Sequence, residues 1–157
     1  MNYTIQTPTL SDTSALYRLI KEHAAFEKSV ASLTEIDLGL LQCQHEAIRF
    51  LVAAEGQTLL GYAALTFDWS VWQAQRYAHL DCLFVSELNR GGGIGRRLFA
   101  AAKILAMQEG VDRMEWQTPI WNEQAVRFYR REGADYQNKS RFIITFGQWP
   151  GGSRIAK

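Results

Sequence analysis

Four glycines lie close together behind an apolar segment: Gly91, Gly92, Gly93 and Gly95 follow residues 80–85, and an amphipathic helical pattern begins directly after them. Glycine has no Cβ atom, so the backbone N–H groups of such a loop can close around phosphate oxygens. The start of the helix adds a positive partial charge at the same point. This order of strand, glycine loop and helix predicts a site for a ligand that carries a phosphate or pyrophosphate group.

The spacing of the glycines excludes two common phosphate-binding motifs. A P-loop requires Lys followed by Ser or Thr after its last glycine, and Arg96 and Arg97 stand there. The dinucleotide fingerprint requires glycine at its sixth position, but that residue is Arg96 counted from Gly91 and Leu98 counted from Gly93. An ordinary glycine-rich surface loop is the alternative to a phosphate site, and the apolar segment before the loop argues against it.

The pattern that fits is Arg90-x-x-Gly93-x-Gly95, which resembles the Arg/Gln-x-x-Gly-x-Gly/Ala signature of the GNAT family of N-acetyltransferases. Residues 121–134 are similar to a second GNAT signature, in which an Asn begins a helix, an Ala follows three residues later and Phe-Tyr precedes Gly-Ala. The resemblance covers nearly the whole chain. It implies acetyl-CoA as the co-substrate and an amine as the acetyl acceptor.

The resemblance also implies which residues hold acetyl-CoA. It implies that main-chain groups of Leu83, Phe84 and Val85 contact the pantetheine arm. The alternative, a plain core strand, can hold at the same time, because main-chain recognition leaves the side chains of a strand free to pack. The other residues implied to bind acetyl-CoA are Arg90, Gly91, Gly92, Gly93, Ile94, Gly95 and Arg96 around the pyrophosphate, together with Asn122 and Ala125.

Tyr129, in the pair Phe128-Tyr129, matches the family's general acid, which protonates the leaving thiolate. The unperturbed pKa is near ~10 for a phenol and ~8.5 for a thiol, so this proton transfer is mildly uphill unless the site changes it. A Tyr at an apolar helical position is also typical of core packing, and this alternative stays open.

A protonated amine cannot attack a thioester, so a base or a chain of waters has to remove a proton from it. The candidates are Asp81, Glu27 and His79. On a regular strand residues 79, 81, 83 and 85 share one face, which predicts that His79 and Asp81 point to the same side. The alternatives are a hydrogen-bonding structural role for Asp81, a solvated helix-end charge for Glu27, and packing for His79.

Within the family, the chain looks most like the spermidine/spermine (diamine) N-acetyltransferase branch. That branch carries an acidic residue at the position of Asp81 and an aromatic–acidic pair like Phe26-Glu27, and both are tied to the polyamine substrate. The chain departs from the branch at two positions, because the branch usually has Glu in place of Asp81 and Asp in place of Cys82. The resemblance therefore implies Phe26, Glu27 and Asp81 as substrate-binding residues, with Asp81 also acting on the amine.

Hydrophobic periodicity and capping residues predict the elements that position these side chains. Strands are predicted over residues 3–7, 50–54, 59–69, 77–85, 111–117 and 141–146. Helices are predicted to begin at Ser11, Thr34, Ile94 and Asn122, the third ending at Gly110 and the fourth at Gly133. This order predicts an α/β (α+β) GNAT fold, a mixed central sheet of about six to seven strands flanked by about four helices.

The chain of 157 residues, of which 47% are hydrophobic, suffices for one core, and a single domain over residues 1–157 is predicted. It has no apolar run of about eighteen residues and no signal-peptide pattern, so a cytoplasmic protein without a membrane partner is expected. A net charge of +1 does not indicate a nucleic-acid partner. Cys43 and Cys82 lack partners at metal-ligand spacing, so neither a metal site nor a disulfide is expected.

The diamine branch is commonly dimeric, which implies a homodimer in which Trp149 and Pro150 participate. The other candidate aromatic residues for an interface, for the core or for an acceptor pocket are Trp69, Trp72, Trp116 and Trp121.

Together these patterns predict an N-acetyltransferase that moves acetyl directly from acetyl-CoA to a primary amine of a small molecule, in a ternary complex. A polyamine or diamine is the expected acceptor. An amino acid, an aminoglycoside and a protein N-terminal amine are the alternative acceptors. A non-catalytic acyl-CoA-binding module is the alternative from another class of protein, and Tyr129 argues against it.

Overall fold

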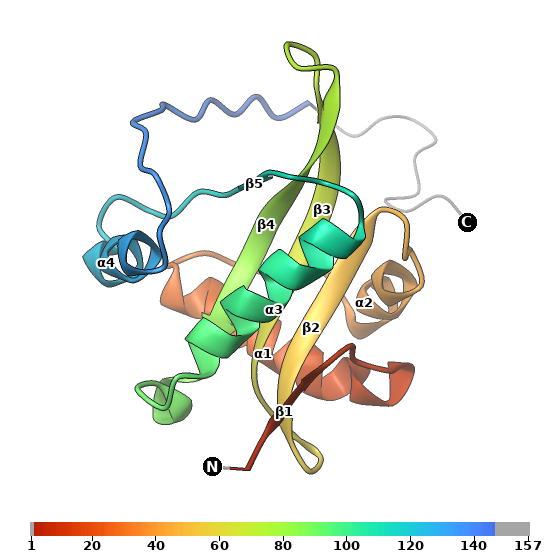
Figure 1. Ribbon diagram of the computed structural model, residues 1–157. Coiled ribbons are helices and arrows are strands. Elements are labelled where there is room, and N and C mark those ends of the chain that lie inside the picture. The colour runs from red at the N-terminus through yellow and green to blue at the C-terminus, as the bar shows by residue number, and fades with distance from the viewer. Residues whose placement is uncertain (1, 147–157) are drawn as a thin grey trace. The chain divides into compact units, whose positions relative to one another are not determined.

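The computed structural model describes residues 2–146, and contacts divide the chain into two compact units, Met1–Gln117 and Thr118–Lys157. The first unit holds a five-stranded sheet in the order β1-β2-β3-β4-β5 (Figure 1). Its strands are β1 (Thr4–Gln6), β2 (Ile48–Glu55), β3 (Thr58–Ser70), β4 (Gln75–Val85) and β5 (Met114–Glu115). The first four strands pair antiparallel, and β5 pairs with β4 in parallel.

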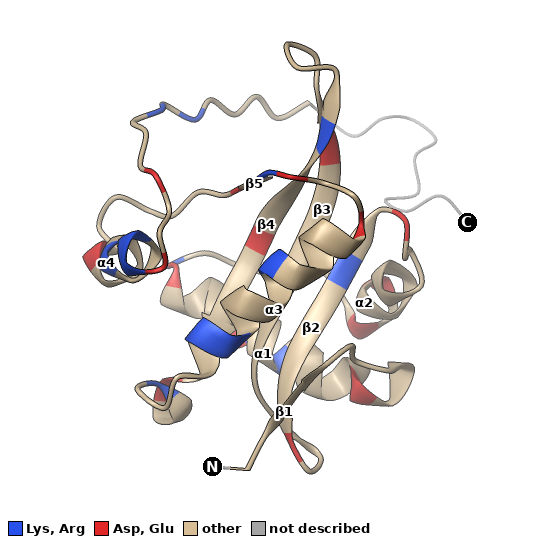
Figure 2. Cartoon of the chain, viewed as in Figure 1, with Lys and Arg blue, Asp and Glu red and all other residues tan. Residues whose placement is uncertain are grey.

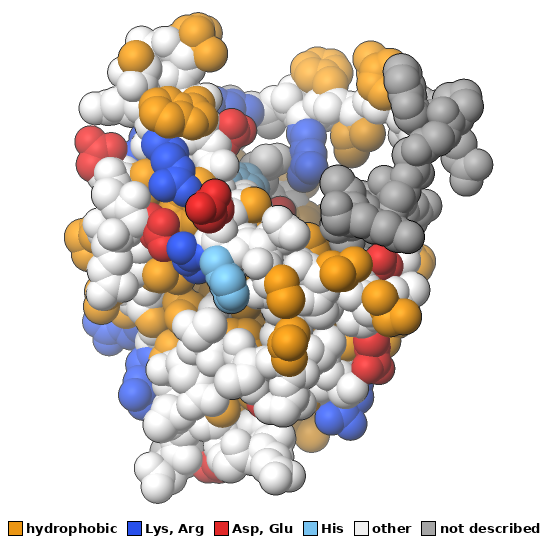
Figure 3. Space-filling view, turned by 90° about the vertical axis from the view of Figure 1, so that its right-hand side faces the viewer, with side chains coloured by type: hydrophobic (Ala, Val, Ile, Leu, Met, Phe, Trp, Pro, Cys, Tyr) orange, Lys and Arg blue, Asp and Glu red, His pale blue; other side chains and the backbone are white. Residues whose placement is uncertain are grey.

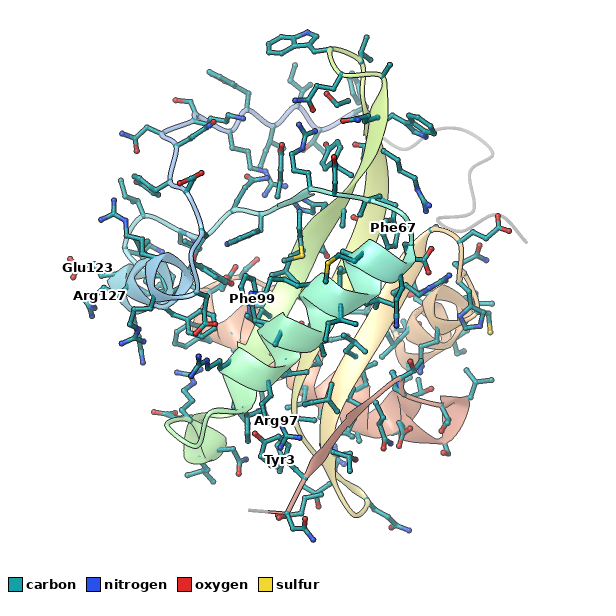
Figure 4. All side chains as sticks on the ribbon, in the orientation of Figure 1. Tyr3, Phe67, Arg97, Phe99, Glu123 and Arg127 are labelled. Carbon is teal, nitrogen blue, oxygen red and sulfur yellow. The ribbon has the colours of Figure 1, made fainter. Side chains whose placement is uncertain are left out.

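Three α-helices cover the sheet of the first unit: α1 (Thr13–Phe26) and α2 (Glu35–Gln42) lie on one face and α3 (Ile94–Gln108) on the other (Figure 1). Leu16, Leu19 and Leu38 form a buried cluster with side chains of β2, β3 and β4. Opposite them, the apolar stripe of α3 is buried as its helical spacing predicts. Arg97 of α3 places its guanidinium 4.6 Å from the ring centroid of Tyr3, beside β1 (Figure 4).

Short-range signals set most of the element boundaries. Thr34 accepts a hydrogen bond from the N–H of Asp37 and the Asp37 carboxylate accepts one from the N–H of Thr34, so α2 begins with the predicted capping box. The helix α1 begins at Thr13, slightly after the predicted start at Ser11, because residues Leu10–Asp12 form a 3-10 turn (η1) ahead of it. Gly110 follows α3 with φ of +77°, as expected of a left-handed helix end.

Two predicted strands differ from the structure, in which residues 2–146 form five strands where six to seven were expected. The strand predicted over residues 111–117 is only Met114–Glu115, and residues 141–146 form no strand. Phe142 and Phe146 are instead exposed. A strand requires a neighbouring strand as well as β-forming residues, and residue preference does not say whether that neighbour exists.

The hairpin between β3 and β4 ends in apolar side chains that contact solvent. Trp69 is 66% and Trp72 99% exposed, with Val71 between them, so neither tryptophan belongs to the core. Hydrophobic side chains at the top of the space-filling view lie at the level of this hairpin (Figure 3). Trp116 packs inside the first unit, edge-on against Phe99 of α3.

The second unit, as far as it is described, contains α4 (Glu123–Arg131). The Asn122 side chain accepts a hydrogen bond from the N–H of Ala125 at 3.1 Å, which confirms the predicted cap of this helix. An ion pair between Glu123 and Arg127 lies along its surface (Figure 4). Trp149 and Pro150 lie outside the described residues, and no helix among residues 2–146 is long and apolar enough to cross a membrane.

Candidate active site

One edge of β4 is open along the second half of the strand. β5 pairs with β4 only at Ala78 and His79, so within the described residues no strand pairs with residues 80–85 on that side. The predicted cofactor residues Leu83, Phe84 and Val85 lie in this stretch. An open strand edge presents main-chain donors and acceptors to an extended ligand, so it suits the amide-containing pantetheine arm of acetyl-CoA.

The glycine loop connects the end of β4 to the start of α3. Gly91 and Gly93 have φ of +84° and +79°, a left-handed conformation that glycine adopts without strain, and Gly93 is the N-cap residue of α3. Behind the exposed glycines, Ile94 is buried and fixes the start of the helix. The first N–H groups of a helix have no acceptor within it, so this geometry fits a pyrophosphate group.

Arg90 ties the loop to its surroundings. Its Nε donates a hydrogen bond to the Val85 carbonyl oxygen at 3.0 Å, and its guanidinium lies 4.5 Å from the Phe26 ring centroid and 5.5 Å from that of Phe84. The Phe26 and Phe84 rings are themselves 6.3 Å apart. The structure therefore brings the end of α1, the end of β4 and the glycine loop together at one side chain.

A β-bulge at Asp81 changes the predicted arrangement of side chains along β4. Leu80 pairs with Leu65 and Cys82 with Ala64, so Asp81 has no residue opposite it. The extra residue reverses the alternation, and residues 79, 82 and 84 face the α1 side while residues 83 and 85 face the α3 side. The prediction that residues 79 to 85 at odd numbers share a face was therefore wrong.

The carboxylate of Asp81 nevertheless lies 4.0 Å from Nε2 of His79, and its side chain is 57% exposed. Figure 2 shows acidic colouring partway along β4, between stretches of uncharged residues. Glu27, directly after α1, has a side chain that is 38% exposed, with its carboxylate 3.5 Å from Nε2 of His23. Both acidic residues that the sequence analysis named thus remain open to solvent.

His23 is a residue of this site that the sequence analysis did not identify. Its Nδ1 lies 2.9 Å from the Tyr62 hydroxyl, and its ring stacks on Phe84 at 4.9 Å and 18°. Burial lowers the pKa of His23, and the nearby Glu27 carboxylate opposes that shift. The spacing of four residues between His23 and Glu27 on a helix was the available signal, because it places the two side chains on one face.

Two further polar groups continue inward from His23. Tyr62 is 1% exposed and its hydroxyl interacts electrostatically with the Cys82 thiol, whose Sγ lies 3.6 Å from Oδ2 of Asp81. Burial raises the pKa of Cys82 to about 12 and raises that of Tyr62. Both groups are therefore protonated and uncharged at physiological pH.

Gly61 is a second position that sequence reasoning missed. It lies opposite Val85 in the ladder, and a Cβ atom there would be 2.6 Å from the Phe84 carbonyl oxygen. We expect Gly61→Ala to lower the free energy of unfolding by about 1–3 kcal/mol, because the clash involves backbone that cannot rotate away. The clash also displaces β4, and this displacement is expected to weaken acetyl-CoA binding, measured by calorimetry.

The matched control is Gly39→Ala in α2, where a new Cβ atom has no other atom within 4 Å. A glycine inside a helix is less stable than alanine there, so this variant is expected to gain up to about 1 kcal/mol of stability. Equal stability of the Gly61→Ala variant and the wild type in denaturant titrations contradicts the close approach of the two strands.

The candidate acid Tyr129 belongs to the second unit. It lies on α4, half-buried, with its ring edge-on to Phe128 at a centroid distance of 5.2 Å. Asn122 and Ala125 begin the same helix. The roles of these three residues toward acetyl-CoA stay predictions from the sequence motif.

The profile of the Acetyltransferase (GNAT) family matches residues 13–134, a stretch that includes the glycine loop, the open edge of β4 and α4. The chain belongs to the GNAT acetyltransferase family. It is thus an acetyl-CoA-dependent N-acetyltransferase, and both the predicted family and the predicted mixed α+β fold are confirmed.

Named relatives cover almost the full chain. Thialysine N-epsilon-acetyltransferase of Caenorhabditis elegans is 30% identical over 148 residues, which are 92% of this chain and 91% of that protein. The Mus musculus protein of the same name is 26% identical over 147 residues, 87% of this chain and 86% of that protein. An aminoglycoside acetyltransferase from a soil metagenome shares the fold, with a TM-score of 0.79, 20% identity and coverage of 92% and 97%.

Proposed function

We propose that this enzyme acetylates a primary amine of a small molecule that carries a second positive charge, as diamines and polyamines do. The observation that carries the proposal is the pair of solvent-accessible carboxylates, Glu27 and Asp81, which both act electrostatically on His23 on the α1 side of the sheet. Two carboxylates at one acceptor site suit a substrate with two ammonium groups, one to react and one to anchor.

An amino acid whose side chain ends in a primary amine is the second candidate acceptor. It is favoured by the relatives that are named for acetylating thialysine at its epsilon nitrogen. Such a substrate also carries two amines, so the same carboxylates suit it. The two candidates differ in the α-carboxylate, which a polyamine lacks.

The proposed reaction assigns one task to each part of the site. Acetyl-CoA supplies the thioester, which the main chain of residues 83–85 and the glycine loop would hold. The amine attacks the thioester carbonyl directly, after Asp81 has taken a proton from the ammonium group. Tyr129 gives a proton to the CoA thiolate as it leaves. Over one turnover the ammonium nitrogen loses two protons, of which one ends on CoA and one is released.

The proposal is tested by acetylation of an amine panel, with CoA release as the readout. Glu27→Gln is expected to lower kcat/KM by about tenfold, or roughly 1.4 kcal/mol, for diamines and polyamines, because a neutral amide loses one charged hydrogen bond. Amines with an uncharged tail are expected to change little. Asp81→Asn is expected to lower kcat for every amine, because it removes the group that takes up the proton.

Glu22→Gln, at an exposed position on α1, serves as the control that removes the same charge from the same helix. It is expected to leave kcat/KM for all the amines unchanged. Equal losses of Glu27→Gln on spermidine and on an amine with a neutral tail argue against the diamine proposal, as does a wild type inactive on every diamine.

We also propose that residues 1–157 act as one catalytic domain and that the protein forms a homodimer. The family profile supports the first point because it spans both compact units. The exposed tryptophans of the β3–β4 hairpin support the second point, since apolar surface of this kind is common at subunit contacts. Analytical ultracentrifugation of the wild type tests for the dimer.

A further inference from the structure

A chain of polar side chains lies among apolar core side chains on the α1 side of the sheet and joins the two carboxylates of the proposed acceptor site. It runs from Asp81 through the Cys82 thiol and the Tyr62 hydroxyl to His23, whose other ring nitrogen faces Glu27. Leucine and phenylalanine side chains of the core surround its middle part. One hydrogen-bond partner is enough to offset the burial of the Tyr62 hydroxyl. Here the chain of polar groups instead continues on both sides of that hydroxyl and reaches an ionisable group at each end.

We propose that His23 holds, until the product leaves, the proton that Asp81 removes from the substrate amine, and that the proton reaches it through Cys82 and Tyr62. This inference rests on the proposed role of Asp81. His23 does not touch the amine, and it acts through the other members of the chain.

The transfer balances without leaving a charge in the middle of the chain. The protonated Asp81 carboxyl gives its proton to Sγ of Cys82, the Cys82 proton passes to the Tyr62 oxygen, and the Tyr62 proton passes to Nδ1 of His23. His23 becomes an imidazolium whose Nε2–H faces the Glu27 carboxylate. After the product leaves, the proton returns along the same groups to water at the exposed Asp81 side chain.

The groups that face His23 from each neighbouring element fit this role. Glu27 of its own helix segment and Asp81 of β4 favour the imidazolium, whereas burial and the Arg90 guanidinium of the glycine loop oppose it. Tyr62 of β3 and Cys82 of β4 both hold their protons in the resting site. His23 therefore starts uncharged at neutral pH, with Nδ1 available as an acceptor and Glu27 placed to stabilise the charge that arrives.

The test is the pH dependence of kcat/KM, measured on the primary amine that the wild type acetylates best. The wild type is expected to lose activity on the acid side with a pKa below 6.5, as His23 becomes protonated before turnover. His23→Gln is expected to lose this acid limb and to lower kcat/KM at neutral pH by about 10²-fold. Acetyl-CoA binding and the Tm at neutral pH are expected to stay close to those of the wild type.

Tyr62→Phe cuts the chain but keeps the ring and leaves His23 in place. It is expected to lose the same acid limb while His23 still titrates by NMR, and the double variant is expected to be no slower than either single variant. Tyr62→Phe also carries the test alone should His23→Gln fail to fold. His45→Gln, at an exposed position after α2, is the histidine control and is expected to retain the wild-type profile.

Three results overturn the inference. They are an unchanged acid limb in a folded His23→Gln variant, loss of the limb in His79→Gln instead, and wild-type activity of Tyr62→Phe. If the wild type prefers diamines but the acid limb is unchanged in the His23→Gln and Tyr62→Phe variants, this inference alone is rejected. If the wild type prefers monoamines and both variants lose the acid limb, the diamine proposal alone is rejected.

Discussion

Replacing Tyr129 with phenylalanine is expected to lower kcat by about 10²-fold while acetyl-CoA still binds with its wild-type affinity. The substitution keeps the ring, so the edge-on contact with Phe128 in α4 is retained and only the hydroxyl is lost. Without a proton donor, the CoA thiolate has to leave as an anion or take its proton from water. Steady-state kinetics with CoA release as the readout, together with calorimetry of acetyl-CoA binding, measure the two quantities separately.

Tyr136→Phe provides the matched control in the same unit. Its ring lies 5.1 Å from the Arg130 guanidinium, and it is not a candidate acid. This variant is expected to have the wild-type kcat. If Tyr129→Phe turns over as fast as Tyr136→Phe, Tyr129 is a packing residue and another donor protonates the thiolate.

Replacing Gly93 with valine is expected to lower the affinity for acetyl-CoA by at least about tenfold, or roughly 1.4 kcal/mol. Gly93 has φ of +79° at the start of α3, a conformation that a β-branched residue strongly disfavours. The loop has to change shape to accept valine, and its N–H groups then no longer converge on the pyrophosphate. Calorimetric titration with acetyl-CoA and with CoA measures the loss.

Gly110→Val separates the loss of the binding site from general strain. Gly110 follows the other end of α3 with a nearly identical φ of +77°, and a Cβ atom at either glycine has no other atom within 4 Å. Both variants are expected to lose stability, but only Gly93→Val is expected to lose cofactor affinity. Wild-type affinity in a folded Gly93→Val variant shows that the loop does not hold the pyrophosphate.

Features that depend on neighbouring residues in the sequence were predictable. The glycine loop, the capping box at Thr34 and the cap at Asn122 each follow from a few adjacent side chains, and the structure has all of them. The long strands β2, β3 and β4 also follow from local β-preference and a turn at Gly56. These signals suffice for the family and for the backbone geometry of the glycine loop.

Features that depend on pairing across the sheet were not predictable. The bulge at Asp81 arises from the register of β4 against β3, and nothing in the residues around position 81 specifies it. The contact between His23 and Tyr62 joins residues 39 positions apart, so it needs the packed helix and sheet to exist first. Residues 141–146 illustrate the converse, because strand-forming side chains there pair with no strand among residues 2–146.

Because of the bulge, the folding of the sheet depends little on which side chain stands at position 81. Asp81 contributes no cross-strand pair and its side chain is 57% exposed, so exchanging it removes little packing. Its neighbours Leu80 and Cys82 hold the register on either side. Substitutions at position 81 are therefore expected to report on the chemistry of the proposed acceptor site with little loss of fold stability, so their effects on kcat need only a small correction for unfolded protein.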